Sequence, residues 1–263
     1  MSRPSQQQLG FLFSIGNGTR QGGVLSPRLF ARYIREVLYA VVNSGIGCNV
    51  GGLMLNILAY ADDIVLICPS WRGLQRLLDL LVVNISNIDM VANPAKSVCM
   101  VFAPKKRVNI VSASFPHLQL GSEHLEFVDN FKYLGHRIVD SNTDDSDIQR
   151  ELSNLFVRTN ILLRRFCKCT KLVKVALFKS YCLCMYALWK RYNATTTSKL
   201  RSAYNKCIKI FFGFRRRDSM TNVLFQLGLP SFDTIIHNAS FSFLRQSSMC
   251  NNRLVKHLLA LRC

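Results

Sequence analysis

The chain has 263 residues, of which 49% are hydrophobic, and it carries 34 Lys and Arg residues against 15 Asp and Glu residues. This apolar content excludes a disordered chain, because it supplies enough buried surface to offset the entropy lost on folding. The formal net charge of +19 favours a polyanionic partner such as nucleic acid, since basic side chains neutralise phosphates. Residues 151–263 carry almost all of the excess, with 20 Lys and Arg residues and three acidic ones.

The ten cysteines follow no secretory leader, so we expect reduced thiols without disulfide partners in an intracellular protein. The spacing of Cys167, Cys169, Cys182 and Cys184 leaves a metal site open as an alternative, although zinc ligands usually stand on a turn and these lie in apolar helical stretches. The uncharged stretch 37–61 has a polar, glycine-rich centre, which predicts a loop and no membrane segment.

The first half of the chain alternates between strand and helix patterns. Residues 11–15 predict a short strand, and the next helix begins with Ser26 as its N-cap and Pro27 at its first position. Gly45 ends this helix. Its apolar face comprises Phe30, Ile34, Val37, Leu38, Val41 and Val42.

Two apolar runs, 53–58 and 64–68, flank Asp62 and Asp63, which predicts a buried hairpin with charges at its turn. Two adjacent carboxylates among apolar strands repel each other unless a cation neutralises them. The pair therefore indicates a magnesium site, because that ion prefers oxygen ligands. The alternative is that two aspartates merely make a good turn.

A second helix begins after Ser70 and ends at Asn93-Pro94. Residues 98–102 predict a strand, and residues 127–138 predict a strand pair or hairpin. The apolar face of the second helix comprises Leu74, Leu77, Leu78, Leu81, Val82, Ile85 and Ile88.

The second half of the chain is helical in pattern. Asp144, Asp145 and Asp147 predict a helix start, where acidic side chains interact favourably with the positive end of the helix dipole. Helices with Lys and Arg on their outer faces are predicted near 171–191 and 199–212. The apolar stripe of the helix that starts at these aspartates comprises Ile148, Leu152, Leu155, Phe156, Leu162, Leu163 and Phe166.

These patterns predict an α+β fold with three parts. An antiparallel sheet with packed helices occupies residues 1–140, a basic all-helical region occupies 141–213, and a helical C-terminal extension occupies 214–263.

Other segments fit either a binding role or ordinary structure. The glycine-rich segment 18–27, which contains Arg20, either offers N–H donors to an anion at a helix N-terminus or is a simple turn. Lys96 either reaches a phosphate or lies exposed after a helix stop. The basic runs 105–107 and 215–217 serve nuclear import or phosphate binding, or are solvated surface, which is the commoner case.

Together, these segments resemble the reverse transcriptases of non-LTR (LINE-type) retrotransposons. Residues 13–30 are similar to the family's G-x-R-Q-G-x-x-L-S-P-x-L-F block, and residues 60–63 to its Y-A-D-D hairpin. Residues 93–96 are similar to its N-x-x-K block, and residues 131–135 to its F-K-Y-L-G hairpin. The blocks follow the family's order over residues 11–138, so the set is specific although each block alone is not.

The resemblance implies a partial polymerase palm over residues 1–140 followed by a basic helical thumb. It implies RNA-directed DNA synthesis, in which a primer 3′-hydroxyl attacks the α-phosphate of a deoxynucleotide and two Mg²⁺ ions stabilise the charge. The partners would be an RNA template, a DNA primer and deoxynucleotides. Because the family copies itself into chromosomes, the resemblance also suggests a nuclear location.

The resemblance assigns roles to single residues as well. Asp62 would be a direct metal ligand and Asp63 a supporting carboxylate, while Lys96 would stabilise or protonate pyrophosphate. The other candidates are the nucleotide and template contacts Arg20, Gln21 and Gly22, the primer contacts Tyr133, Leu134 and Gly135, and the nucleic-acid backbone contacts Arg158, Arg164, Arg165, Lys168, Lys171 and Lys174.

Family members carry a further metal-binding aspartate well upstream of the R-Q-G block, and here the 19 residues before Arg20 contain neither Asp nor Glu. We therefore expect a truncated or decayed copy with little or no polymerase activity alone. One alternative is a non-catalytic nucleic-acid-binding relic, retained for its basic C-terminal region. Another is a product without a stable fold, since missing strands would leave a sheet edge exposed.

Overall fold

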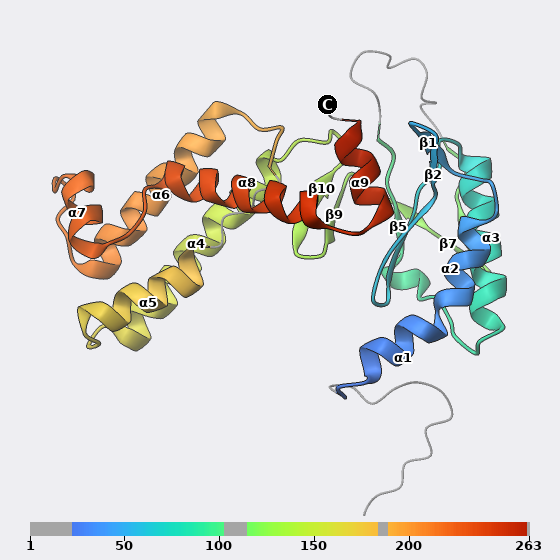
Figure 1. The fold of residues 1–263 in the computed structure, drawn as a ribbon, viewed down its shortest axis with the longest axis horizontal. Coiled ribbons are helices and arrows are strands. Elements are labelled where there is room, and N and C mark those ends of the chain that lie inside the picture. Colours follow the sequence, from blue (N-terminus) through green and yellow to red (C-terminus); the bar gives the residue numbers. More distant parts are fainter. Residues whose placement is uncertain (1–22, 103–114, 184–188, 262–263) are drawn as a thin grey trace, which may run out of the picture. The chain divides into compact units, whose positions relative to one another are not determined.

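The structure, a computed structural model, describes residues 23–102, 115–183 and 189–261 of the chain (Figure 1). It contains two compact units that each combine helices with short strands, which confirms the predicted α+β class. No helix in these three stretches has the length and apolar character needed to cross a membrane. The first unit comprises the described residues of Met1–Val98 and Ser114–Glu126, and the second those of Cys99–Ala113 and Phe127–Cys263.

The first unit contains the helices α1 (Ser26–Tyr33), α2 (Arg35–Val42) and α3 (Trp71–Ser86). The helix predicted from Ser26 is present, but it divides at Ile34, whose ψ of −9° departs from the helical value of about −42°. Leu25, rather than Ser26, is the N-cap. Val42 is 46% exposed, so its predicted place on the apolar face is wrong. The buried residues of α2 are Val37 and Val41.

Helix α3 ends at Ser86 rather than at the predicted residues 93–94. Asp89 adopts a left-handed φ of +53°, which a continuing helix does not allow. The Met90 N–H donates a hydrogen bond to the Ile85 carbonyl at 3.0 Å and closes the last turn.

Helices α2 and α3 share the core of the first unit. The predicted cap of α3 is confirmed, because the Ser70 hydroxyl accepts a hydrogen bond from the Gly73 N–H at 3.2 Å. The buried core residues are Ile34, Val37, Val41, Leu77, Leu81 and Ile85, and the strand residues packed against them include Ile57, Ile64 and Leu66.

The strands of the first unit form separate hairpins. The antiparallel pairs are β1 (Cys48–Val50) with β2 (Leu53–Leu55), β3 (Ile57–Tyr60) with β4 (Asp63–Leu66), and β6 (Gln119–Leu120) with β7 (Glu123–His124). The limits of the two units fall within a further pair, β5 (Val98–Cys99) and β8 (Glu126–Phe127), so neither of these strands belongs wholly to the first unit. The described strands thus form two-stranded sheets instead of the single sheet predicted for residues 1–140. The predicted strand 53–58 divides at Asn56, and the predicted loop within 37–61 contains β1.

The second unit contains β9 (Asn130–Tyr133), β10 (His136–Val139), α4 (Asp145–Phe166), α5 (Lys171–Cys182), α6 (Ala194–Phe212), α7 (Met220–Leu227), α8 (Phe232–Met249) and α9 (Arg253–Ala260). The hairpin predicted within 127–138 and the helix predicted near Asp144 are confirmed. Helix α5 ends at Cys182 and α6 begins at Ala194, so the predicted bounds of these two helices are wrong by several residues.

The core of the second unit lies between helices α4 to α8. Phe178 and Phe211 stack with their ring centroids 6.1 Å apart. The Tyr204 hydroxyl donates a hydrogen bond to the Pro230 carbonyl at 2.9 Å. The predicted stripe of α4 is confirmed, and its most buried apolar residues are Ile148, Leu155 and Leu162. The limits between the three predicted parts of the chain stay predictions.

Candidate functional site

Asp62 and Asp63 lie at the tip of the β3–β4 hairpin, as predicted. Tyr60 pairs with Asp63 across the strands, so Ala61 and Asp62 form a two-residue turn. Ala61 adopts a left-handed φ of +52°, a conformation that costs about 1–3 kcal/mol for a residue other than glycine. All four residues are exposed, so the predicted burial of the hairpin is wrong at its tip. Only the base of the hairpin packs against the core. The carboxylates of Asp62 and Asp63 therefore remain in contact with water, and their burial does not require a cation.

Sequence reasoning missed Asn56, which anchors the base of this hairpin. Asn56 is 2% exposed, and its Nδ2 donates to the Val41 carbonyl at 2.7 Å and to the Ile46 carbonyl at 2.9 Å. The first of these carbonyls lies at the C-terminus of α2, where helix carbonyls lack partners inside the helix. The Ile67 N–H donates to the Asn56 carbonyl at 2.8 Å. Gly47 lies so close to Asn56 that a Cβ at position 47 would be 2.6 Å from the Asn56 Cβ.

Lys96, the third predicted catalytic residue, ends the short 3₁₀ helix η1 (Pro94–Lys96) and is exposed. It lies in the same unit as Asp62 and Asp63. The predicted nucleotide and template contacts lie outside the described residues; they are Arg20, Gln21 and Gly22. The convergence of these side chains on one nucleotide therefore stays a prediction.

The oxygen donors that the hairpin offers to a metal are the carboxylates of Asp62 and Asp63. Across the described stretches, no group of three or more His, Cys, Asp or Glu side chains is arranged to hold an ion. Two carboxylates at an exposed turn nevertheless fit magnesium, which keeps several waters and commonly shares one or two protein carboxylates with substrate phosphates. They would bind the ion together with a nucleotide rather than alone.

The β9–β10 hairpin carries the predicted primer contacts. Tyr133 pairs with His136, so Leu134 and Gly135 form the turn. Their φ angles are +46° and +85°, and two positive values are what a type I′ hairpin turn requires. Tyr133 is half-buried, whereas Leu134 is 46% exposed at the tip. The turn therefore presents a leucine side chain to solvent at the end of a tight hairpin.

Sequence reasoning placed Asp147 at a helix start but missed its partners. The Asp147 side chain is 4% exposed, and its Oδ1 accepts hydrogen bonds from the Arg137 N–H at 2.8 Å and the Arg150 Nε at 2.7 Å. Its Oδ2 lies 2.9 Å from both the His136 Nδ1 and the Trp189 Nε1. Burial raises the pKa of this carboxyl, but the four hydrogen bonds outweigh burial and lower the pKa to about 2. Asp147 thus joins β10, α4 and the segment before α6.

Asp144 and Asp145 hold that same segment through its backbone. The Asp144 carboxylate accepts hydrogen bonds from the N–H groups of Lys190 and Arg191, each at 2.6 Å. The Asp145 carboxylate accepts one from the Asn193 N–H at 2.9 Å. These aspartates take N–H groups that a helix would bond internally, which explains why the helix predicted to reach residue 191 does not do so.

The six predicted nucleic-acid backbone contacts differ in their surroundings. Lys174 is half-buried, with its Nζ 5.6 Å from the centroid of the Phe211 ring. Arg158 pairs with the carboxylate of Glu151, which is 1% exposed, so this guanidinium is engaged within α4. The exposed members of the set are Arg164, Arg165, Lys168 and Lys171.

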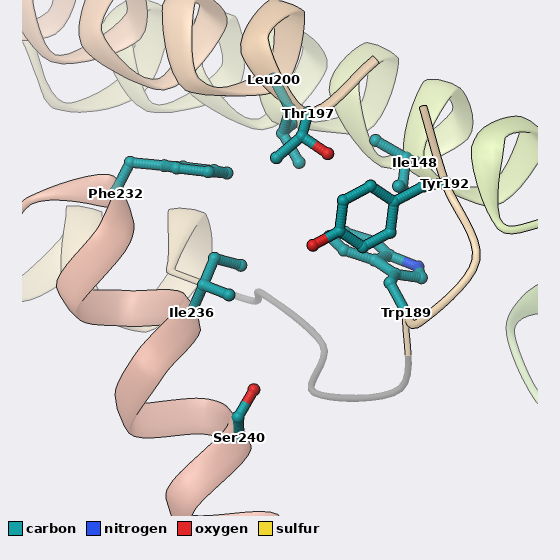
Figure 2. A pocket seen from close by; sticks show the side chains of 8 residues that line it. All are labelled: Ile148, Trp189, Tyr192, Thr197, Leu200, Phe232, Ile236 and Ser240. Carbon is teal, nitrogen blue, oxygen red and sulfur yellow. The ribbon is translucent and has the colours of Figure 1, made fainter. Parts of the chain in front are cut away.

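A small cavity in the second unit is too small for a nucleotide. Figure 2 shows the cavity, of about 20 Å³, with Trp189 and Tyr192 near Ile148 on one side and Phe232 and Ile236 on another. Its volume accommodates about one water molecule, whereas ligand sites usually measure about 300–1,000 Å³. Its role is therefore in packing.

A wider groove lies between α4 and α6. Its volume is about 310 Å³, and the Lys206 Nζ lies 5.7 Å from the centroid of the Phe156 ring that helps to line it. Ammonium groups beside apolar side chains and hydroxyls suit a sugar-phosphate chain. Sequence reasoning missed this groove because its residues come from two distant segments. The residues that line it are Leu152, Phe156, Ser198, Lys199, Ser202, Ala203 and Lys206.

Two comparisons with known proteins show what this chain is similar to. A family model described as reverse transcriptase (RNA-dependent DNA polymerase) matches residues 5–138. The Retrovirus-related Pol polyprotein from type-2 retrotransposable element R2DM of Drosophila melanogaster is 34% identical over 128 residues. These residues cover 47% of this chain and 12% of that polyprotein, so the chain spans only a small part of its relative's length. The range of the family match includes the turns at residues 60–63 and 133–135 and Lys96.

Proposed function

We propose a function for this chain on the ground that it belongs to the reverse transcriptase (RNA-dependent DNA polymerase) family, whose model matches just over half of its length. The chain carries reverse transcriptase sequence of a non-LTR retrotransposon. The proposed reaction is RNA-directed DNA synthesis. A primer 3′-hydroxyl bonds to the α-phosphate of a deoxynucleotide, and pyrophosphate leaves with the electrons of the broken bond.

The acidic hairpin would serve the reacting phosphate. Asp62 would bind a divalent ion directly and Asp63 would support it, and Mg²⁺ is the ion that suits their oxygen donors. When bound, such ions neutralise charge on the attacking and leaving oxygens. Lys96 would provide a positive charge for the leaving pyrophosphate. Arg20, Gln21 and Gly22 would line the nucleotide and template pocket.

The second unit would hold the nucleic acid. The turn at residues 133–135 would contact the primer end, and the exposed basic side chains at and after the end of α4 would bind phosphates without reading sequence. An RNA template and a DNA primer are the proposed partners. Nuclear residence follows if the chain acts where its family copies into chromosomes.

The observation that supports this function best is the order of the motifs within the matched segment. The carboxylate turn at 60–63, the lysine at 96 and the turn at 133–135 all fall within residues 5–138. Two of these motifs lie on hairpins with tight turns, and the third lies at the end of a 3₁₀ helix.

Binding and primer extension by the purified 263-residue chain test the proposal. Residues 1–19 offer no carboxylate as a further metal ligand, so we expect an RNA–DNA primer–template to bind without being extended in Mg²⁺. Extension that is lost in Asp62→Ala would show that the chain alone is an active polymerase and would contradict this expectation. Absence of salt-sensitive binding would contradict the function as a whole.

A second candidate function is a non-catalytic nucleic-acid-binding protein, which the +17 charge of residues 151–263 favours. A nucleotide-dependent measurement separates the two. A polymerase-derived site should bind primer–template more tightly when Mg²⁺ and the deoxynucleotide that matches the template are present, and Asp62→Ala should remove this gain. A simple binder should show no effect of the nucleotide.

A further inference from the structure

Asp147 connects three segments of the second unit through one buried carboxylate. Each of its two oxygens has two donors, which fills the acceptor capacity of an ionised aspartate. Two of the four donors, the Arg137 N–H and the His136 Nδ1, belong to β10. His136 directly follows Gly135 of the turn, so the contact acts beside the tip of the hairpin.

We propose that Asp147 is a positioning residue that fixes the β9–β10 hairpin on helix α4, so that the turn at residues 133–135 meets a primer end in one orientation. The positioning role rests on the proposed function, because it assumes that this turn contacts the primer.

The hairpin needs such an anchor because its strands are short. β9 and β10 have four residues each, and an isolated two-stranded hairpin is marginally stable in water. A hydrogen bond to a buried carboxylate is stronger than one between neutral groups, and the two bonds from the Arg137 N–H and the His136 Nδ1 restrict both the rotation and the distance of β10 relative to α4.

The far end of the connection is also fixed. Trp189 donates to Asp147 at 2.9 Å, and its ring lines the small cavity with Ile148 and Tyr192 (Figure 2). The backbone that follows Trp189 is bonded to Asp144 through the N–H groups of two residues. The Asp147 carboxylate therefore lies between the packed indole of Trp189 and the β9–β10 hairpin. This arrangement holds the hairpin rigidly.

Asp147→Asn tests the role with little change of shape. Whichever way the amide turns, it keeps one acceptor oxygen and sets its NH2 group against two of the four donors that Asp147 now faces. The matched control is Asp145→Asn in the same helical turn, because Asp145 bonds to Asn193 and not to the hairpin. Both variants remove one negative charge, so a general effect of charge cancels in the comparison.

The first measurement is amide hydrogen exchange of residues 130–139 in the free chain. We expect Asp147→Asn to speed exchange in this hairpin by about tenfold and Asp145→Asn to leave it unchanged.

The second measurement is the preference for a primer end. It is the dissociation constant for a blunt duplex divided by that for the same duplex with a recessed primer 3′ end. We expect Asp147→Asn to lower this ratio about fivefold while blunt-duplex affinity changes little, because the basic helices are intact.

Unchanged hairpin exchange in Asp147→Asn would overturn the proposal, as would an equal loss of primer-end preference in Asp145→Asn. A further outcome is that the native chain shows no primer-end preference while Asp147→Asn still speeds exchange in the hairpin. That result would contradict the primer contact and with it the positioning role, but Asp147 would still stabilise the hairpin on α4. If Asp147→Asn does not fold, His136→Phe gives the same test, because it removes one hairpin donor and keeps a ring. Unchanged exchange in that variant would equally overturn the proposal.

Discussion

Asn56 holds the acidic hairpin through hydrogen bonds from its side-chain amide to two main-chain carbonyls. Replacing it with Ala removes both of these hydrogen bonds, although the Val41 carbonyl still accepts one from the Ser44 N–H at 3.2 Å, and the loss of a partner from a buried acceptor costs about 1–3 kcal/mol. We therefore expect Asn56→Ala to lower the free energy of unfolding by about 2 kcal/mol in urea denaturation. Asn87, exposed at the C-cap of α3, provides the control, and Asn87→Ala should cost less than about 0.5 kcal/mol. Equal costs would show that Asn56 is no anchor.

Asp147 makes the stability of the chain depend on pH in the acid range. Its pKa of about 2 in the folded chain lies below its ordinary value of 3.8. A carboxylate with a depressed folded pKa contributes its full stabilisation above the unfolded pKa, and loses it as the pH falls through the folded pKa. Between about pH 5 and about pH 2, we expect the free energy of unfolding to fall about 2 kcal/mol further in the native chain than in Asp147→Asn. Chemical denaturation at several pH values measures this difference, and parallel profiles would contradict it.

Residues whose role depends on local spacing could be predicted, whereas those that depend on distant partners could not. Asp62 and Asp63 lie at a turn because apolar runs flank them, and Ser70 caps α3 because a hydroxyl reaches the N–H three residues on. Apart from the bond between Asp147 and Arg150, Asn56 and Asp147 act through residues 10 to 42 positions away, which no local pattern encodes. The predicted burial of the acidic turn failed for the same reason, since packing decides which part of a hairpin is covered.

The exposed basic side chains at the end of α4 give the helical region a measurable property. Log affinity falls as log salt concentration rises, and each phosphate contact that is lost should make this slope less steep by about one. We therefore expect the triple variant Arg164→Ala, Arg165→Ala and Lys168→Ala to bind a primer–template with a clearly shallower salt dependence. The control is Arg201→Ala, because this arginine is paired with Asp233 at 2.6 Å. A triple variant that matches the control would exclude these side chains as phosphate contacts.

Helices with a strong apolar stripe were predictable as elements, but their ends were not. Helix α3 is present with its predicted cap, yet it stops at Ser86 because Asp89 turns left-handed. Residues 190–193, the end of the predicted helix 171–191 and the two residues after it, are not helical, because Asp144 and Asp145 bind N–H groups of this segment. The split of the predicted strand at Asn56 likewise reflects a bond to α2. In the last two cases a tertiary contact overrides a local preference.

At the scale of the whole molecule, charge and chemistry are divided along the chain. The acidic hairpin and Lys96 belong to the first unit, and the β9–β10 hairpin with the basic helices belongs to the second. Residues 151–263 carry +17 of the net charge of +19. This division agrees with a chain in which one part serves the reacting nucleotide and another holds the nucleic acid by its phosphates. Composition predicted the basic half, and the ordered motifs predicted the family.

We propose that Asp62 and Asp63 hold a divalent ion beside a nucleotide, and iron-mediated cleavage locates such an ion. Fe²⁺ takes the place of Mg²⁺ in the presence of primer–template, deoxynucleotide, ascorbate and peroxide, and it cuts the chain near the bound ion. We expect cuts close to residues 60–63, which excess Mg²⁺ suppresses and which Asp62→Ala with Asp63→Ala abolishes. Both residues are exposed, so the variant should fold normally. Cuts that fall elsewhere, or that persist in the double variant, would contradict metal binding by Asp62 and Asp63.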